Sequence, residues 1–188
     1  MKSPGVRVSS GALRGRNLEV PDGVRPTEQK VREALFSIWG DRIRDASMLD
    51  LFAGSGAVGI EGVSRGALTA TLVESRRSTL EALKRNLSIV PCASVRVLGV
   101  PVEKALDQLS GRGEEFDIIF ADPPYAWIPD AAFFIACAPL LSSGGVLTLE
   151  HSSRTALPIE VGEWVRTDER RYGESALSFY GRSEIERG

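Results

Sequence analysis

The chain has 188 residues, of which 43% are hydrophobic and 26% charged, and its net charge is −2. This composition is that of an ordinary globular domain large enough to bury a substantial core, and it excludes a disordered chain. No apolar run reaches the roughly 20 residues of a membrane helix, and the N-terminus lacks the apolar stretch of a secretion signal. Cys92 and Cys137 are far apart in sequence, which favours neither a disulfide framework nor a zinc cluster, so we expect a cytoplasmic protein.

The basic residues are concentrated near the N-terminus. Residues 1–32 contain seven basic and three acidic side chains, so this segment has a charge of +4 and the remainder a charge of −6. A basic arm on an acidic body indicates a polyanionic partner. On this evidence alone, a basic face that is merely solvated explains the asymmetry equally well.

The first predicted elements are a hairpin and a helix. Val6–Val8 and Asn17–Val20 flank a basic, glycine-rich connection and predict two short strands. Thr27 is a suitable N-cap for the helix that follows, and Gly40 is a suitable stop. The apolar positions of this helix fall on one face and are Val31, Ala34, Leu35, Ile38 and Trp39.

Beyond this helix, short apolar runs alternate with amphipathic segments. The predicted strands are Ser47–Phe52, Ala70–Glu74, Ser94–Leu98, Phe116–Ala121 and Gly144–Glu150, with two more within Glu163–Tyr180. The predicted helices are Ala57–Gly66, Arg77–Ser88, Val102–Leu109 and Asp130–Leu141. The pattern predicts an α/β fold: a doubly wound, mostly parallel sheet of seven strands with an antiparallel C-terminal edge. We divide the chain into a basic hairpin arm, residues 1–26, and one domain, residues 27–188.

A glycine-rich turn follows the first strand of the domain. LDLFAGSGAVG contains Gly54-x-Gly56-x-x-Gly59 between a strand and a helix, the pattern of a nucleotide-binding loop. Glu74 ends the next strand, where a carboxylate can accept hydrogen bonds from ribose hydroxyls. The spacing does not distinguish a nicotinamide dinucleotide, whose pyrophosphate needs a free helix N-terminus, from S-adenosylmethionine, whose ammonium group can pair with Asp50.

The second motif is the corner Asp122-Pro123-Pro124-Tyr125, directly after the strand Phe116–Ala121. The Asp122 carboxylate and the Pro123 carbonyl can accept the N–H bonds of an exocyclic amine and free its lone pair for attack on a methyl sulfonium. The prolines fix the backbone and lack competing donors, and Tyr125 can stack on a flat base. This chemistry needs neither a metal nor a covalent enzyme intermediate. Taken alone, however, the motif is equally a strand end with a turn.

These motifs occur in an order that resembles one family. RGRNLEVPDGVRPTEQKVREALFSIW, DLFAGSG, DPPY and Arg171-Tyr172-Gly173 are similar to those of the bacterial RsmD-type methyltransferases, over almost the whole chain. The resemblance implies a Rossmann-like class I methyltransferase fold with an N-terminal β-hairpin, and methylation of a guanine N2. It also implies S-adenosylmethionine as cofactor, S-adenosylhomocysteine as product, and 16S rRNA in an assembled or assembling 30S subunit as partner. We expect a monomer.

The resemblance also implies roles for single residues. The cofactor would be bound by Asp50, Phe52, Ala53, Gly54, Ser55, Gly56, Glu74, Ser75 and Val100. The target base would be held by Asp122, Pro123, Pro124 and Tyr125. Arg7, Arg14, Arg16, Arg25 and Thr27 would contact the RNA, and Arg25, Pro26 and Thr27 would close over the site. Where related enzymes carry a polar residue towards adenine this chain has Gly99-Val100, so we expect a backbone N–H and apolar packing there.

Other functions stay open at this point. The amine could be adenine N6 or a glutamine amide, although DNA-modifying relatives usually add a recognition segment that has no room here. A nicotinamide-dependent oxidoreductase leaves the corner and the basic arm unexplained. A non-catalytic RNA-binding module explains the arm but not the paired motifs. His151, Trp39 and Trp164 are interpreted as structural, whereas Trp127 is near enough to Tyr125 to stack beside it.

Overall fold

A computed structural model describes residues 6–21, 29–90, 95–124 and 127–183 of the chain. Its helices are α1 (Gln29–Trp39), α2 (Ala57–Ser64), α3 (Arg77–Leu87), α4 (Val102–Ser110) and α5 (Ala131–Cys137). Its strands are β1 (Val6–Arg7), β2 (Asn17–Leu18), β3 (Ser47–Leu51), β4 (Thr69–Val73), β5 (Val95–Leu98), β6 (Phe116–Ala121), β7 (Leu141–Ser152), β8 (Glu160–Val161), β9 (Trp164–Tyr172) and β10 (Ser175–Arg182). The predicted elements are therefore present, with most of their boundaries shifted by a few residues.

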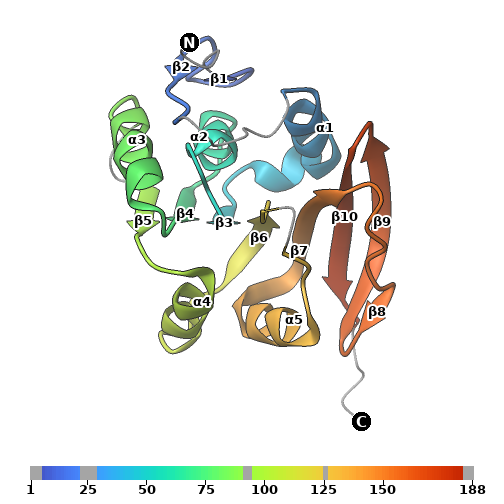
Figure 1. Cartoon of the computed structure of the whole chain (residues 1–188). Helices are drawn as coiled ribbons and strands as arrows, with labels where there is room; N and C mark the ends of the chain where they lie inside the picture. The colour runs from blue at the N-terminus through green and yellow to red at the C-terminus, as the bar shows by residue number, and fades with distance from the viewer. Residues whose placement is uncertain (1–5, 22–28, 91–94, 125–126, 184–188) are drawn as a thin grey trace.

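One sheet of eight strands forms the centre of the molecule, in the order β5-β4-β3-β6-β7-β10-β9-β8 (Figure 1). The first five of these strands are parallel, and β10, β9 and β8 are antiparallel to their neighbours. The predicted α/β class and its antiparallel C-terminal edge are confirmed. The prediction of seven strands was wrong by one, because β8 has two residues and is too short to show an alternating pattern.

The strand order reverses between β3 and β6. The chain runs from β3 outward to β4 and β5, then returns to β6 on the other side of β3, with Asp50 in register with Phe120. In open α/β sheets, ligands bind beyond the carboxyl ends of the strands at such a reversal. The predicted proximity of the glycine loop and the Asp122 corner follows from this topology.

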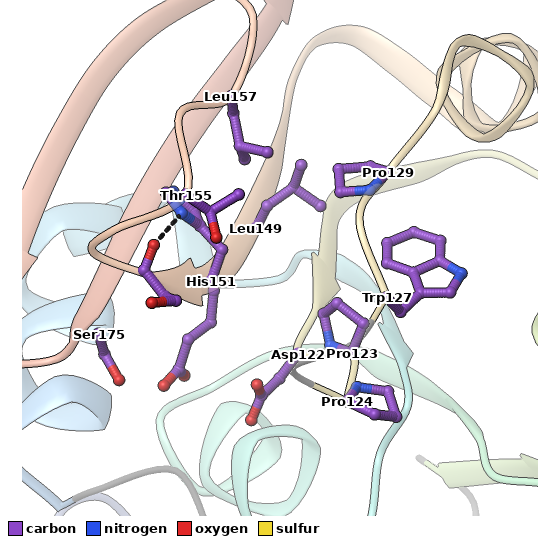
Figure 2. Close-up of a pocket in the computed structure, with 12 residues that line it drawn as sticks. Asp122, Pro123, Pro124, Trp127, Pro129, Leu149, His151, Thr155, Leu157 and Ser175 are labelled. Carbon is purple, nitrogen blue, oxygen red and sulfur yellow. Dashed lines mark hydrogen bonds between the residues drawn. The ribbon is translucent and has the colours of Figure 1, made fainter.

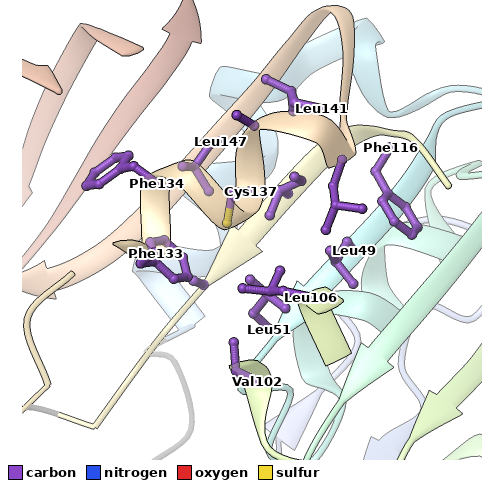
Figure 3. Packing of buried hydrophobic residues seen from close by; sticks show 14 of the residues in the cluster. Leu49, Leu51, Val102, Leu106, Phe116, Phe133, Phe134, Cys137, Leu141 and Leu147 are labelled. Atoms are coloured by element: carbon purple, nitrogen blue, oxygen red, sulfur yellow. The ribbon is translucent and has the colours of Figure 1, made fainter. Parts of the chain in front are cut away.

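Helices cover both faces of the sheet (Figure 1). α1, α2 and α3 lie on one face, and α4 and α5 on the other, where a large apolar cluster forms (Figure 3). In that cluster Phe133, Phe134 and Cys137 of α5 pack on strand residues such as Leu49 and Leu147. Cys137 is a core residue as predicted, whereas Cys92 lies outside the described residues. Within the described ranges, no helix is long and apolar enough to cross a membrane.

The buried face of α1 differs from the prediction. Three predicted positions are buried, namely Val31, Leu35 and Trp39. Ile38, however, is 37% exposed, and the charged side chain of Arg32 is only 1% exposed. The difference arises because α1 packs beside the N-terminal hairpin as well as on the sheet, and a carboxylate on α2 compensates the buried guanidinium.

That carboxylate belongs to Glu61, which is 0% exposed. It accepts hydrogen bonds from Nε of Arg32 at 2.8 Å, from Nη2 of Arg65 at 2.7 Å and from the hydroxyl of Ser9 in the hairpin. Arg32 also donates to the backbone carbonyl of Arg7 at 2.8 Å. Burial opposes ionisation of Glu61, but the hydrogen bonds from Ser9, Arg65 and Arg32 outweigh it and lower the pKa of this carboxyl. The hairpin is therefore docked on α2 through a buried charged network.

Close backbone contact completes the docking. The strands β1 and β2 pair as predicted, with Val6 opposite Leu18. Gly11, in the connection between them, has φ +81°, and a Cβ at this position would lie 1.7 Å from the carbonyl oxygen of Ser64. Only glycine allows the hairpin to approach the end of α2 so closely. Residues 6–21 of the basic arm are thus packed on the domain.

Replacement of Glu61 by alanine should destabilise the protein strongly. The change leaves the buried guanidinium of Arg32 without its carboxylate, and loss of one member of a buried pair costs about 3–5 kcal/mol. Urea denaturation of Glu61→Ala measures the loss. Glu81→Ala is the control, because Glu81 forms an exposed 3.9 Å pair with Arg77 and should cost less than about 0.5 kcal/mol. Equal unfolding free energies for the two variants would contradict the role given to Glu61.

Candidate active site

The glycine loop connects β3 to α2, and its shape is fixed by packing. Gly56 precedes α2 with φ +82°, and a Cβ there would lie 2.4 Å from Cδ1 of Leu83 on α3. A Cβ at Gly59 would lie 2.1 Å from Cδ2 of Leu72 on β4. Both glycines are therefore required for α2 to sit close to the sheet and to α3, which is the close helix–strand packing expected of this motif.

Two carboxylates hold the loop. Oδ2 of Asp50, at the end of β3, accepts a hydrogen bond from the N–H of Gly59 at 3.0 Å. Glu74, just after β4, accepts the N–H of Gly54 at 3.1 Å and that of Arg76 at 2.7 Å. The acidic residue predicted to bind ribose hydroxyls thus also orders the loop, a contact that the sequence did not indicate.

Asp50 is in an unfavourable environment for a negative charge. Its side chain is 1% exposed, and burial raises the pKa of the carboxyl to about 8. Burial is the largest cause of this rise in pKa; the hydrogen bond from Gly59 opposes it, and the nearby charges of Asp122 and Glu74 contribute to it. Three acidic groups therefore lie near one another at the carboxyl ends of the central strands.

This arrangement bears on the choice between the two nucleotide cofactors. A pyrophosphate requires free N–H groups at the helix N-terminus, but Asp50 already binds the N–H of Gly59 in the first turn of α2. The diphosphate would also face the nearby carboxylates of Glu74 and Asp122. A sulfonium cofactor with an ammonium group would instead meet charges of opposite sign. The described residues thus fit S-adenosylmethionine better than a nicotinamide dinucleotide.

An apolar wall adjoins the loop. Phe52, Leu98 and Val100 are partly buried and pack on the cluster below α4 and α5. Phe52 has φ +64°, unusual for a residue with a bulky side chain, and its ring lies 5.3 Å from that of Trp127. Val100 belongs to this apolar group, and its contact with adenine stays a prediction.

The Asp122 corner follows β6 directly. The N–H of Trp127 donates to the carbonyl of Pro124 at 2.8 Å. The indole of Trp127 packs edge-on between Phe52 and Phe133, at 5.3 and 5.0 Å between ring centroids. Among the described residues, none donates a hydrogen bond to the Pro123 carbonyl. The corner is therefore braced by aromatic packing. Trp127 also lines the pocket beside the corner, and its stacking beside Tyr125 stays a prediction.

A small pocket opens beside this corner, with about 30 Å³ available to the centre of a water-sized sphere (Figure 2). Its walls come from the corner, the end of β7, the start of β10 and the segment between β7 and β8. Its polar lining is formed by Asp122, Glu150, His151, Ser152, Thr155 and Ser175. Figure 2 shows the side chains of Asp122 and Ser175 extending towards the same end of the pocket. The pocket combines apolar side chains with hydrogen-bonding groups beside the Asp122 corner.

His151 is engaged in local hydrogen bonds. Its Nδ1 lies 2.9 Å from the carbonyl of Ser152 and its Nε2 lies 2.9 Å from the hydroxyl of Ser178. A proton on Nδ1 satisfies both contacts, and burial lowers the pKa of the imidazole. This agrees with the interpretation of His151 as a structural polar residue. Trp39 and Trp164 are buried, and each indole N–H donates within the core, to Thr148 and to Phe134.

The structure brings most predicted site residues to one crevice. Loop residues from Phe52 to Gly56 lie between the Asp50 and Glu74 carboxylates, and Ser75 is exposed after β4. Arg7, Arg14 and Arg16 are exposed on the hairpin. Four predicted residues, Arg25, Pro26, Thr27 and Tyr125, lie outside the described residues. The binding role of each residue stays a prediction. Sequence reasoning missed Glu150, which only the pairing of β6 with β7 brings beside Asp122.

Comparisons with known proteins agree with this geometry. The family model described as "Conserved hypothetical protein 95" matches residues 6–181. "Ribosomal RNA small subunit methyltransferase D" of Escherichia coli K12 is 34% identical over 181 residues, 94% of this chain and 90% of that protein. A solved hypothetical protein of Thermus thermophilus is 37% identical with a TM-score of 0.80, covering 93% of this chain and 98% of its own. The ribosomal protein L11 methylase of Lactobacillus delbrueckii shares the fold alone, at 15% identity and a TM-score of 0.66 over 87% of this chain and 84% of its own.

Replacement of Asp50 by asparagine should change how stability depends on pH. Because the folded-state pKa, about 8, lies above the ordinary 3.8, the carboxyl stabilises the fold fully at low pH, and this contribution is lost as pH rises through 8. Asparagine does not titrate and keeps an oxygen for the Gly59 N–H. Between about pH 5.5 and 8.5, urea denaturation should show the unfolding free energy of Asp50→Asn rising relative to wild type by more than about 1 kcal/mol.

The control for this measurement is Asp41→Asn, since the Asp41 side chain is exposed and its difference from wild type should not vary with pH. A constant difference for Asp50→Asn across this pH range would contradict the burial of a protonated carboxyl at the end of β3.

Proposed function

The chain belongs to the RsmD family, described as conserved hypothetical protein 95, and from this premise we propose that it transfers a methyl group from S-adenosylmethionine to a guanine N2 in 16S ribosomal RNA. The observation that carries the proposal is the pairing of β3 with β6, which puts the glycine loop and the Asp122 corner at one crevice. The Escherichia coli relative, similar over 94% of the chain, bears the name of a small-subunit rRNA methyltransferase.

S-adenosylmethionine supplies an electrophilic methyl group and leaves as S-adenosylhomocysteine. In this proposal the Glu74 carboxylate binds the ribose hydroxyls from the end of β4. The ammonium group of the cofactor favours ionisation of the Asp50 carboxyl and then pairs with it. Phe52, Leu98 and Val100 pack against the adenine. Each of these residues follows or ends a strand of the sheet, so the cofactor surface is built on rigid elements.

The corner activates the amine. The Asp122 carboxylate accepts one N–H of the guanine N2 group, and the Pro123 carbonyl accepts the other. Both contacts draw the nitrogen towards tetrahedral geometry and make its lone pair available to the methyl group. Pro123 and Pro124 cannot compete as donors, and their fixed φ angles keep the carbonyl in place. Most of the rate enhancement then comes from alignment of the two reactants.

The hairpin serves as the RNA contact. We assign residues 1–26 to this role and residues 27–188 to the methyltransferase domain, with Arg25 and Thr27 contributing to the RNA contact where the two meet. Arg7, Arg14 and Arg16 are exposed, and within the described part of the chain none of them forms an ion pair with a carboxylate. Their charges are thus available to phosphates. The proposal includes a cytoplasmic monomer that acts on an assembled or assembling 30S subunit.

Wild-type enzyme incubated with unmodified small subunits and a tritiated methyl donor should produce labelled N2-methylguanosine. Asp122→Ala should lower the rate roughly 100- to 1,000-fold, because one of the two acceptors for the amine is lost, while retaining S-adenosylhomocysteine binding. The measurement is digestion of the RNA and chromatography of the labelled nucleosides, together with calorimetry for the cofactor.

Asp107→Ala is the control, since Asp107 is exposed on α4. Labelled N6-methyladenosine would instead support the adenine alternative. Undiminished turnover by Asp122→Ala would remove the corner from the mechanism, and saturable NAD binding without S-adenosylmethionine binding would overturn the methyltransferase proposal.

The double change Arg14→Ala with Arg16→Ala should weaken RNA binding at all sequences and reduce its salt dependence. Each lost phosphate contact lowers the slope of log affinity against log salt by about 1. Filter binding of 16S rRNA at several salt concentrations measures this slope. Arg112→Ala, on the opposite side of the sheet after α4, should leave it unchanged, and an unchanged slope in the double variant would exclude the hairpin as a phosphate contact.

A further inference from the structure

Glu150 lies beside Asp122 in the pocket. The strands β6 and β7 are parallel, with Ala121 paired to Leu149, so the next residues, Asp122 and Glu150, are neighbours. Glu150 lies within β7, so its side chain is on the opposite face of the sheet from that of Leu149, and Asp122 directly follows the last residue of β6. Both residues line the pocket, and Glu150 is 7% exposed.

The backbone of Glu150 is held on both sides. Glu150 is paired with Leu177 of β10 on one side and lies next to the end of β6 on the other. It is therefore an interior position of the sheet. Ser175 of β10, two residues before Leu177, lines the same pocket from the other side (Figure 2). The strand order β6-β7-β10 therefore presents a carboxylate, a second carboxylate and a hydroxyl in sequence across the pocket.

We propose that Glu150 selects guanine by accepting a hydrogen bond from its N1–H while Asp122 accepts from the N2 amine. This inference rests on the function proposed above. The edge of guanine presents O6, N1–H and the N2 amine in that order, an acceptor followed by two donors. The hydroxyl of Ser175 can donate to O6, the Glu150 carboxylate accepts N1–H, and Asp122 accepts from N2. The order of groups across the strands matches the order of atoms on the base.

Adenine fits this row of groups poorly. Its N1 is an acceptor without hydrogen, so the lone pair would face the buried Glu150 carboxylate. A site built to bind an N–H rejects an analogue that lacks it, because a buried polar group then loses its partner. The discrimination from one such contact is on the order of 10- to 100-fold. Asp122 and Pro123 activate an amine of either base, whereas Glu150 distinguishes between the two bases.

The test uses 2,6-diaminopurine at the nucleotide that wild-type enzyme methylates. This base keeps the N2 amine, but its N1 is an acceptor and its C6 carries an amine in place of O6. Small-subunit RNA with guanine or diaminopurine at this position is compared by kcat/KM. Wild-type enzyme should prefer guanine by roughly 10- to 100-fold. Equal rates on the two RNAs would overturn the inference without any variant.

Glu150→Gln supplies the second comparison. The amide NH2 of glutamine can donate to N1 of diaminopurine, but in that orientation it repels the N1–H of guanine. The guanine preference should fall at least about 10-fold, by slower methylation of guanine and faster methylation of diaminopurine. A purely structural role of Glu150 would slow both substrates equally, and an unchanged preference would therefore overturn the inference. S-adenosylhomocysteine affinity and thermal unfolding report whether the variant is folded.

The matched control is Glu174→Gln, because Glu174 is an exposed glutamate in the turn between β9 and β10. Among the described residues, its one ion pair is a 3.5 Å contact with the exposed side chain of Arg154. It should keep the wild-type preference. Failure of wild-type enzyme to form N2-methylguanosine would refute the proposed function itself, whereas formation of this product with an unchanged preference in Glu150→Gln would refute only the role of Glu150.

Discussion

The hydrogen bond between the Gly59 N–H and the buried Asp50 carboxylate is the contact on which the site depends. It joins the end of β3 to the first turn of α2 and thereby determines the path of the glycine loop between them. It also places an acidic group inside the protein, where burial raises its pKa to about 8. The loop geometry and the electrostatics of the crevice thus have one origin. The same hydrogen bond occupies an N–H group at the N-terminus of α2 that a pyrophosphate would need. It therefore disfavours a nicotinamide dinucleotide as cofactor.

Acidic groups at neighbouring strand ends repel one another when ionised, which reduces the stability of the fold. Asp50 ends β3, Asp122 follows β6 and Glu150 lies near the end of β7, and the parallel register brings the last two side by side. Such a cluster is stabilised by ligands that bring positive charge or N–H donors. In the proposed function, a sulfonium cofactor supplies the first and a guanine edge the second. The electrostatics of these strand ends and the proposed specificity are therefore two aspects of the same arrangement.

Much of the fold could be predicted from the sequence because local patterns determine it. Buried strands and amphipathic helices alternate clearly, and the glycine loop and the Asp122 corner are collinear motifs. The predictions failed where contacts between residues far apart in the sequence determine the burial or position of a side chain. The burial of Arg32 depends on Glu61, 29 residues away, and the position of Glu150 depends on the register of β6 with β7. No local pattern contains either contact, and the two-residue strand β8 is too short for any pattern.

The basic hairpin and the cofactor loop form one rigid unit, although the charge pattern alone describes an appended arm. The side chain of Asn86 on α3 accepts the N–H of Glu19, just after β2, at 2.8 Å and donates to its carbonyl at 2.9 Å. The same amide donates to the carbonyl of Ser55 in the glycine loop at 2.9 Å. With the Glu61 network holding the other end of the hairpin, residues 6–21 have little freedom to lose in the RNA binding that we propose for them. A preorganised surface binds at a lower entropic cost than a mobile one. A small domain can therefore position its RNA substrate and its cofactor relative to each other through a single buried amide.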